Sequence, residues 1–593
     1  MTCKRSYHFT ALSRLPLFNT SLLVLVFFTS GSALASTVPT FLPATTYTWD
    51  GGDPEVLTLV DMNADGSPDL LVSGSGAIGV LLGDGKGAFQ EPSAYYLTGG
   101  QAASRPVVAD VNGDGNPDLV VAEACAGWLG NCISGETLVG VLLGNGDGTL
   151  QPAVVYKTGG FSAAFSVAVA DLNGDGKLDL VAADWRCTDS GPEGCVSVLL
   201  GNGDGTFQPA QVYASGGWNA QSLVLADVNG DNKLDILVTN GGGVSSSIGV
   251  LLGNGDGTFH SAVAYGSGGG FALDLVLADV NRDSRPDLLV TNVYSNTIGV
   301  LLGNGDGTFG TAVAYSSGGQ GIVSFAVADL NNDGSLDLVL ANCGAAFGFC
   351  PGNGSVGVLL GKGDGTFATA ATYDVGAFPN SPEAIAVADL DGDGNPDVVV
   401  ARFFSGLVGV LQGRGDGTFQ PAVFYDSGIY RASGIYPAHM LSAQNVTGNG
   451  KPDLVLIGDD RTGRGEVGVL LNNTSIDTTP PLITISTTPK VLWPPNGNLV
   501  PVKISGRITD VGSGVNVNSA TYAVKDEYGK IQPQGTITLG PNGAYSFAVL
   551  LQASRLGSDM DGRRYTLTVQ AKDNAGNVGS NTAAVIVPHD RGN

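Results

Sequence analysis

A short loop rich in Asp and Asn recurs seven times along the chain, each time between two apolar stretches. In the clearest copy Asp110, Asn112, Asp114 and Asp118 are spaced as D-x-N-x-D-G-x-x-D between PVVA and LVV. Carboxylates crowded this closely repel one another unless a cation neutralises them. A hard cation with about six to eight oxygen ligands suits this set, and Gly115 supplies the sharp turn that directs them inward. The loops therefore predict about seven calcium sites.

The loops recur at intervals of 49 to 61 residues, so a repeated structural unit must position them. Each unit has the same order. An alternating stretch such as FSVAVA enters the loop, one such as LDLVAA leaves it, and VGVLLGNGDGTF and PAVVY follow after a hairpin of variable length. Alternation and β-branched residues indicate strands, and Asn-Gly-Asp-Gly is typical of a tight turn. Four antiparallel strands in about 50 residues predict a propeller blade.

The two ends of the repeat region predict how the ring of blades closes. The segment FLPATTYTW, from Phe41, resembles a fourth strand without the three that should precede it, and the last unit ends at VGVLLNNTS without a fourth strand. The N-terminal strand can therefore complete the last blade and remove an open sheet edge. This count favours eight blades; if one irregular unit forms no blade, the number is seven.

The pattern ADLNGDGxLDLVxAN…VGVLLGNGDGTF resembles the FG-GAP/VCBS repeats of bacterial surface proteins and the β-propeller of integrin α subunits, over roughly residues 41 to 473. The resemblance implies a calcium-binding propeller with side-chain ligands at the first, third, fifth and ninth loop positions. Those positions are Asp61, Asn63, Asp65, Asp69, Asp110, Asn112, Asp114, Asp118, Asp171, Asn173, Asp175, Asp179, Asp227, Asn229, Asp231, Asp235, Asp279, Asn281, Asp283, Asp287, Asp329, Asn331, Asp333, Asp337, Asp389, Asp391, Asp393 and Asp397. A degenerate eighth copy has Asn445, Thr447, Asn449 and Asp453, and we do not expect it to hold an ion.

Residues 1–35 have the features of a secretory signal peptide. Lys4, Arg5 and Arg14 precede an apolar run, and Ala33-Leu34-Ala35 is a small-x-small cleavage motif. An uncleaved membrane anchor is the alternative. Without this segment the net charge changes from −26 to −29, which argues against a nucleic-acid partner and against anionic lipid surfaces. We expect a secreted, extracellular or cell-surface protein that does not insert into a membrane after signal removal.

The six remaining cysteines lie close together in pairs: Cys125 with Cys132, Cys187 with Cys195, and Cys343 with Cys350. Behind a signal peptide, such local pairs predict three disulfides that close loops in an oxidising compartment. Zinc is the alternative, but no pair has a nearby His to complete a tetrahedral set.

The sequence changes in character after the repeats. The propeller is predicted over residues 36–473, and a linker containing TTPP over 474–481. Residues 482–593 form six or seven strand-like stretches without a helical period, which predicts an immunoglobulin-like β-sandwich. The end of this region, AKDNAGNVGS…VIVP, resembles bacterial Ig-like modules.

The connections between strands 2 and 3 of a blade, and from strand 4 to the next blade, share one face. The cysteine pairs and four tryptophans, Trp49, Trp128, Trp185 and Trp218, map to them. Rigid aromatic side chains on stapled loops are typical of a recognition surface. The alternative is that the rings cap the blade cores. We therefore expect an adhesion or binding protein for a glycan or an extracellular protein. A polysaccharide-active hydrolase or lyase and a purely structural surface protein are the alternatives; no catalytic residues are predicted, because no His-containing triad is evident.

Overall fold

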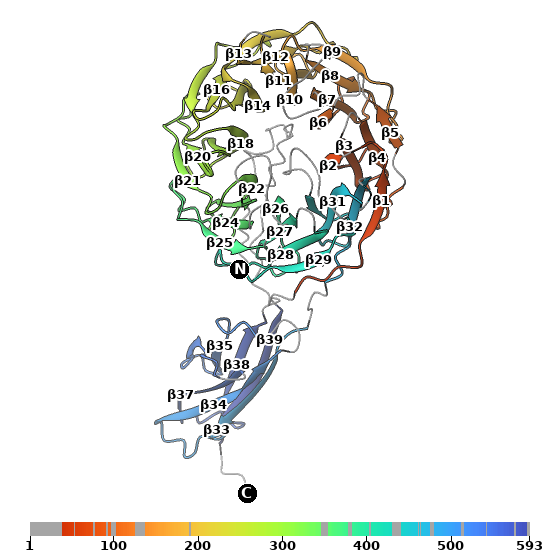
Figure 1. Cartoon of the computed structure of the whole chain (residues 1–593). Coiled ribbons are helices and arrows are strands. Elements are labelled where there is room, and N and C mark those ends of the chain that lie inside the picture. The colour runs from red at the N-terminus through yellow and green to blue at the C-terminus, as the bar shows by residue number, and fades with distance from the viewer. Residues whose placement is uncertain are drawn as a thin grey trace. The chain divides into compact units, whose positions relative to one another are not determined.

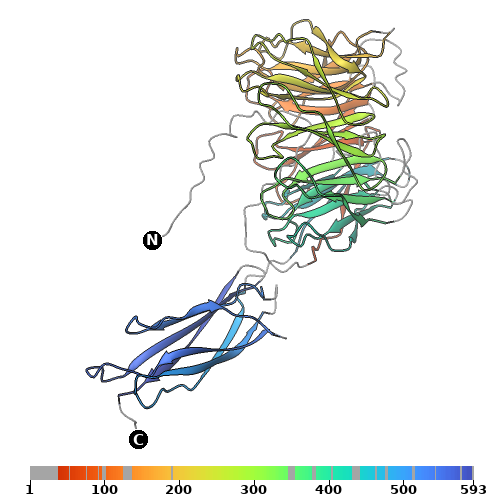
Figure 2. The ribbon, with the colours of Figure 1, turned by 90° about the vertical axis from the view of Figure 1, so that its left-hand side faces the viewer.

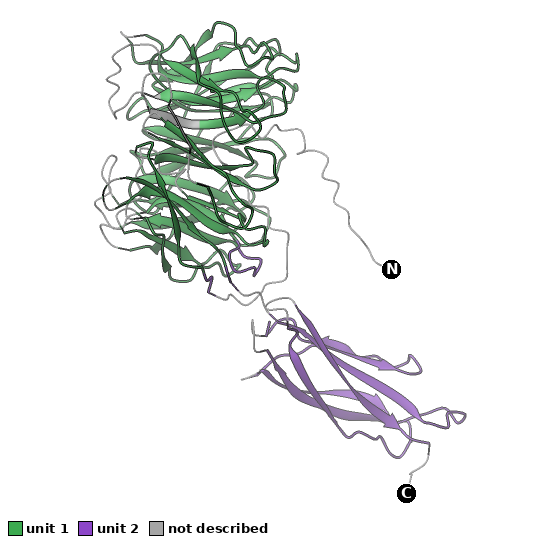
Figure 3. Cartoon of the chain, turned by 90° about the vertical axis from the view of Figure 1, so that its right-hand side faces the viewer, with its two compact units in different colours: residues 1–27, 41–388, 396–472 green, residues 28–40, 389–395, 473–593 purple. Residues whose placement is uncertain are grey.

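A computed structural model provides the structure of the chain. It describes residues 38–589 except 53, 75–76, 91–92, 97–101, 125–136, 189–190, 345–353, 377–381, 403–404, 430–440, 461, 463, 475–478, 511–514, 541–542 and 574–576. The predicted signal peptide, residues 1–35, lies outside this range. The described residues contain no helix that is long and apolar enough to cross a membrane. They divide into two compact units, one mainly of residues 41–388 and 396–472 and the other mainly of residues 473–593 (Figure 3).

The first unit consists of four-stranded antiparallel sheets, as the alternating strands and tight turns predict. Five of them are β2–β5, β6–β9, β10–β13, β14–β17 and β18–β21. Their bounds are β2 Pro54–Val60, β3 Asp69–Gly74, β4 Ala77–Leu81, β5 Ser93–Tyr96, β6 Ala102–Ala109, β7 Asp118–Ala124, β8 Leu138–Leu142, β9 Val154–Lys157, β10 Phe161–Ala170, β11 Asp179–Arg186, β12 Glu193–Leu199, β13 Gln211–Trp218, β14 Ala220–Ala226, β15 Asp235–Asn240, β16 Ser247–Leu251, β17 Val263–Gly266, β18 Ala272–Ala278, β19 Asp287–Asn292, β20 Thr297–Leu301 and β21 Val313–Ser316.

Three further sheets complete this unit, which makes eight among the described residues: β22–β25, β26–β29, and one in the order β1-β32-β31-β30. Their bounds are β22 Ile322–Ala328, β23 Asp337–Asn342, β24 Ser355–Leu359, β25 Ala371–Asp374, β26 Pro382–Ala388, β27 Asp397–Arg402, β28 Leu407–Leu411, β29 Val423–Asp426, β30 Leu441–Gln444, β31 Asp453–Asp459, β32 Gly465–Leu470 and β1 Thr45–Trp49. The sheets follow one another around a ring (Figure 1), which Figure 2 shows from the side. The predicted all-β class is confirmed, and the arrangement is consistent with a β-propeller.

Apolar cores between neighbouring sheets hold the ring together. Val238 of β15 and Leu251 of β16 pack with Val181 of the preceding sheet, while Leu237 and Val250 pack with Leu275 of the following one. The second strand of each sheet is thus buried on both faces, which explains its nearly continuous Val and Leu content.

The ring closes with a strand from each end of the repeat region. β1 pairs antiparallel with β32, with Tyr47 opposite Val467 and Trp49 opposite Gly465. The bridge between Phe41 and Asn472 extends this pairing. The predicted completion of the last sheet by the N-terminal strand is therefore confirmed.

The second unit contains two antiparallel sheets around a common core. One has the order β33-β34-β37 and the other β36-β35-β38-β39. The strands are β33 Leu482–Thr488, β34 Leu499–Thr509, β35 Thr521–Asp526, β36 Gln534–Thr536, β37 Ala544–Gln552, β38 Arg563–Lys572 and β39 Val578–Val587. Val502 and Leu551 of the first sheet pack with Leu567 and Val585 of the second. At one end of the core, the buried guanidinium of Arg563 lies 2.6 Å from a carboxylate oxygen of Asp526.

Candidate calcium loops and the opposite loop face

The seven acidic loops all connect the first and second strands of a sheet, and their own backbone orients the side chains. In the loop between β6 and β7, Asp110 Oδ1 accepts hydrogen bonds from the amides of Gly113 at 2.7 Å and Asp114 at 3.1 Å. Asp110 Oδ2 accepts one from Gly115 at 2.9 Å, and Asn112 Oδ1 accepts one from Asp114 at 2.8 Å. The backbone therefore wraps around the first and third side chains, whose oxygens point into the loop.

The residues present in these loops fit a calcium ion. In the seventh loop, carboxylate oxygens of Asp389, Asp391 and Asp397 lie within 4.8 Å of one another. Several carboxylates in one small volume repel one another when ionised, and a divalent cation with oxygen ligands would relieve this repulsion.

The ninth residue of each loop has a structural task that the sequence did not indicate. Asp118 is fully buried; its Oδ2 accepts the amide of Val111 at 2.9 Å and its Oδ1 accepts the amide of Gly144 at 2.7 Å. Gly144 begins the turn between the third and fourth strands, so the carboxylate joins two connections at the same face of the sheet. Each oxygen keeps a second lone pair, so this task is compatible with the predicted role as a ligand.

The degenerate eighth copy keeps this feature. Asp453 accepts the amides of Val446 at 2.9 Å and Asn472 at 2.7 Å through its two carboxylate oxygens. This explains why a loop that has Asn445, Thr447 and Asn449, and so no carboxylate at its first, third or fifth position, still has its ninth Asp.

The fifth loop departs from most of the others in two ways. Ser284 stands where most copies have Gly, and it adopts a φ of 66° while donating its amide to Asp279 Oδ2 at 2.8 Å. The loop geometry therefore survives the substitution, at the expense of a conformation that favours glycine. Arg282 extends from this loop to the sixth one, where it donates to the carbonyl oxygen of Asp333 at 2.9 Å and to Ser335 Oγ at 2.6 Å.

On the opposite face, polar residues at the end of the second strand join neighbouring sheets. Asn292 Oδ1 accepts a hydrogen bond from Ser267 Oγ at 2.6 Å, and its Nδ2 donates to the Ser267 carbonyl at 2.9 Å. Asn240 makes the same pair of bonds with Ser215. Ser267 follows β17 and Ser215 lies in β13, so each Asn binds the sheet that precedes its own. The sequence analysis did not predict these contacts. The recurrence of Thr-Asn at the end of the second strand could have indicated them.

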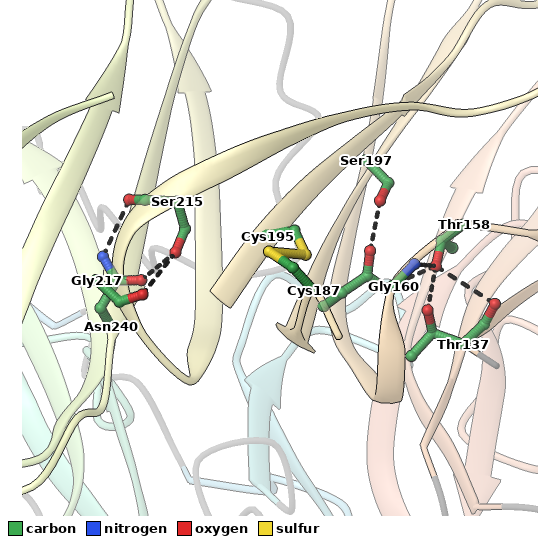
Figure 4. Close-up of a disulfide and its surroundings, with 10 residues drawn as sticks. Thr137, Thr158, Gly160, Cys187, Cys195, Ser197, Ser215, Gly217 and Asn240 are labelled. Atoms are coloured by element: carbon green, nitrogen blue, oxygen red, sulfur yellow. Dashed lines mark hydrogen bonds between the residues drawn. A yellow bond between two sulfur atoms is a disulfide. The ribbon is translucent and has the colours of Figure 1, made fainter. Parts of the chain in front are cut away.

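In the third sheet Asp184 takes the place of this Asn. Thr158 Oγ1 and Ser197 Oγ donate to its two carboxylate oxygens at 2.8 and 2.5 Å. Thr137 hydrogen-bonds to Thr158 (Figure 4). Burial raises the pKa of Asp184 to about 6, and the hydroxyl donors offset part of this effect. The carboxylate is buried and held by hydroxyl donors, so the molecule uses it as a structural acceptor.

The disulfide between Cys187 and Cys195 is present, as predicted, and closes the hairpin beyond β11 (Figure 4). Cys343 is also disulfide-bonded. Its predicted partner Cys350 lies outside the described residues, as do Cys125 and Cys132.

The tryptophans predicted to contact a ligand have different environments. The prediction for Trp49 is wrong: the side chain is 1% exposed, because its ring lies over Gly79 and Gly465, whose missing Cβ atoms leave room for it. Trp185 is partly buried, with its ring 4.8 Å from that of Phe165. Trp218 is 58% exposed, and Trp128 lies outside the described residues.

A model of the FG-GAP-like repeat matches the chain over residues 61–121, 131–182, 184–238, 279–340 and 347–400. No curated protein matches the chain by sequence. Among solved structures, a protein from Lactobacillus plantarum is 13% identical with a TM-score of 0.35, covering 63% of this chain and 96% of that one. The PQQ-bound aldose sugar dehydrogenase of Streptomyces coelicolor is 12% identical with a TM-score of 0.27, covering 52% of this chain and 97% of that one. A mutant of the NanB sialidase of Streptococcus pneumoniae is 12% identical with a TM-score of 0.30, covering 77% of this chain and 71% of that one. Likenesses this weak carry no argument about function.

Proposed function

Because the chain is an FG-GAP repeat protein, we propose that it is a secreted or cell-surface binding protein on a calcium-stabilised propeller. In this proposal the eight sheets of the first unit are the blades of an eight-bladed propeller, and the second unit is an Ig-like domain. The observation that carries the proposal is the separation of chemistry between two faces. Carboxylate loops occupy the face of the 1–2 and 3–4 connections, whereas a disulfide and exposed aromatic rings occupy the other.

Calcium would serve the fold in this proposal. The first, third, fifth and ninth residues of seven loops would hold the ions, as exemplified by Asp389, Asp391, Asp393 and Asp397. A bound divalent cation neutralises carboxylates that otherwise repel one another. It also fixes the connection between the first two strands of a blade.

The opposite face would bind the ligand, a glycan or an extracellular protein. Loop positions on a rigid scaffold suit recognition, because little conformational freedom is lost when a ligand binds. The disulfide between Cys187 and Cys195 stiffens one such loop and is consistent with an oxidising, extracellular compartment.

The test is binding of the secreted chain to an array of glycans and extracellular-matrix proteins, first with calcium and then with excess chelator. We expect saturable binding that is lost in chelator together with a lower melting temperature. A chain that melts cooperatively in calcium and binds nothing on the array would contradict a binding function, and turnover assays on polysaccharides would then address the enzymatic alternative.

A further inference from the structure

Four apolar side chains form a patch on the loop face from the end of the third sheet to the fifth: one ends β13 and three lie in the connections that follow. We call Trp218, Val244, Phe271 and Tyr294 the aromatic patch. Trp218 is 58% exposed, Val244 89% and Tyr294 49%. Exposed side chains of this size are normal when scattered, but neighbouring ones indicate an interaction site.

Backbone contacts make the patch continuous. The amide of Phe271 donates to the Gly243 carbonyl at 2.8 Å, and the amide of Tyr294 donates to the Gly270 carbonyl at 3.1 Å. At the other end, Gly242 packs directly against the side chain of Trp218. The four side chains therefore stand on segments that contact one another from the third sheet to the fifth.

The conformation of Phe271 is unusual for a bulky residue. Its φ is 55°, in the left-handed region that aromatic side chains rarely adopt. Its ring nevertheless stacks on that of Tyr294, with ring centroids 4.9 Å apart and planes inclined by 29°. Backbone strain of this kind persists where the surrounding structure holds it. The same connection has a positive φ in the neighbouring sheets, at Asn219 (58°) and Gly321 (67°), so the fold itself requires this conformation. At Phe271 a large apolar ring occupies the position, where a glycine would fit the backbone better.

The patch lacks charge, in a chain whose net charge is −26. The segments that build it, residues 216–221, 241–247, 266–272 and 293–297, contain no Asp, Glu, Lys, Arg or His. A carboxylate lies at the edge of the patch, because exposed Glu193 of β12 is opposite Trp218 in the strand register. Their polar groups are amides and hydroxyls, such as those of Asn219, Ser295 and Asn296. An anionic partner would find no counter-ion here and would meet the carboxylate of Glu193, whereas a sugar ring offers an apolar C–H face to the rings and hydroxyl groups to the rim.

We infer that the aromatic patch binds a neutral glycan, with Trp218 and the stacked pair Phe271–Tyr294 as the platforms for sugar rings. This inference rests on the proposed function and names the ligand class and the site. The pre-formed stack and the hydrogen-bonded loops lower the entropy lost on binding, which favours a ligand as small as an oligosaccharide.

The test is calorimetric titration of the full chain in calcium with laminarin, mannan, cellohexaose and dextran as neutral probes. Polygalacturonate and heparin are the acidic probes, and a panel of matrix proteins is included. We expect saturable binding of at least one neutral glycan. Trp218→Ala and Phe271→Gly should each weaken it about tenfold or more. Trp493→Ala is the matched control, because Trp493 is an exposed tryptophan, at 40%, in the other unit; it should bind as the unchanged chain does.

Phe271→Gly separates a binding role from a structural one. The glycine relieves the strained φ, so the melting temperature should stay the same or rise while the affinity falls. If a neutral glycan binds but neither variant weakens it, the patch is not the site, although the proposed function stands. If only acidic glycans or proteins bind, the ligand class is wrong while the binding function stands. If nothing binds, both proposals fail.

Discussion

The backbone amide of Phe89, which follows the third strand of the first sheet, donates a hydrogen bond of 3.0 Å to the hydroxyl of Tyr47 in β1. Their rings meet edge to face, with centroids 5.8 Å apart. The same contact recurs between successive sheets, for example between Tyr213 and Phe259. At Tyr47, however, it joins the first sheet to the strand that closes the ring, so one repeated contact also serves ring closure.

We expect Tyr47→Ala to loosen the closing strand more than the equivalent change elsewhere. β1 is the outermost strand of its sheet and has no covalent connection to β32, so it can separate locally, whereas β13 is tethered at both ends. Limited proteolysis should therefore cut the variant within residues 41–49 faster than the unchanged chain. Tyr213→Ala, which removes a similar ring and hydrogen bond, is the control. Equal resistance of both variants would show that closure does not depend on this contact.

Calcium removal should destabilise the first unit. Excess chelator should lower its melting temperature by mass action, since the ions bind the folded loops and not the unfolded chain. Asp110→Ala should reduce the number of calcium ions bound by one out of about seven in a calorimetric titration. An unchanged melting curve in chelator would contradict a stabilising role for calcium. An unchanged stoichiometry in the variant would show that the second loop holds no ion.

Asp453→Ala should destabilise the fold without changing calcium binding. The substitution leaves the buried amides of Val446 and Asn472 without their acceptor, which costs about 2–4 kcal/mol for two such groups. The eighth loop has no other carboxylate, so the ion stoichiometry should stay the same. Urea denaturation of this variant measures the loss of stability, and calcium titration measures the number of bound ions. Loss of one bound ion would show that the eighth loop is a calcium site after all.

The strands, their grouping in fours and the closing strand could all be predicted, because each depends on local alternation or on a simple count of units. The environment of a site residue was harder to predict where the contact comes from a residue of another sheet. Nothing near Trp49 in the sequence shows that Gly79, about 30 residues later, and Gly465, at the far end of the repeats, leave space for its ring.

The loop residues illustrate the same limit. The spacing of Asp110, Asn112 and Asp114 within a few residues reveals a shared site, since the backbone of one loop brings them together. The second task of Asp118 depends on Gly144, which lies 26 residues further along. Likewise, the bond between Asn292 and Ser267 joins two sheets and is not visible in either repeat alone. A repeated sequence pattern therefore predicts the contacts within each sheet, but not the contacts between neighbouring sheets.

Asp184 should make stability fall as the pH rises through the mildly acidic range. Its pKa in the folded chain is about 6, against an ordinary value of 3.8, so the folded state binds the proton more tightly than the unfolded state. The contribution of Asp184 to the free energy of unfolding is then greatest below pH ~4, and it is lost as the pH rises through ~6, where the folded carboxyl ionises. Asp184→Asn removes this dependence. The variant should fold well, because Asn240 occupies the equivalent position in the next sheet and accepts from Ser215 in the same way.

The measurement is the free energy of urea unfolding at pH 4.5 and 7.5 in saturating calcium, for the unchanged chain and for Asp184→Asn. Comparing the two chains cancels the pH dependence that calcium binding contributes to both. The variant should gain about 1–3 kcal/mol relative to the unchanged chain between the lower and the higher pH, since one pKa unit corresponds to about 1.4 kcal/mol. Parallel pH profiles would mean that Asp184 is ionised at both pH values in the folded protein. The hydroxyls of Thr158 and Ser197 would then stabilise its charge fully despite burial.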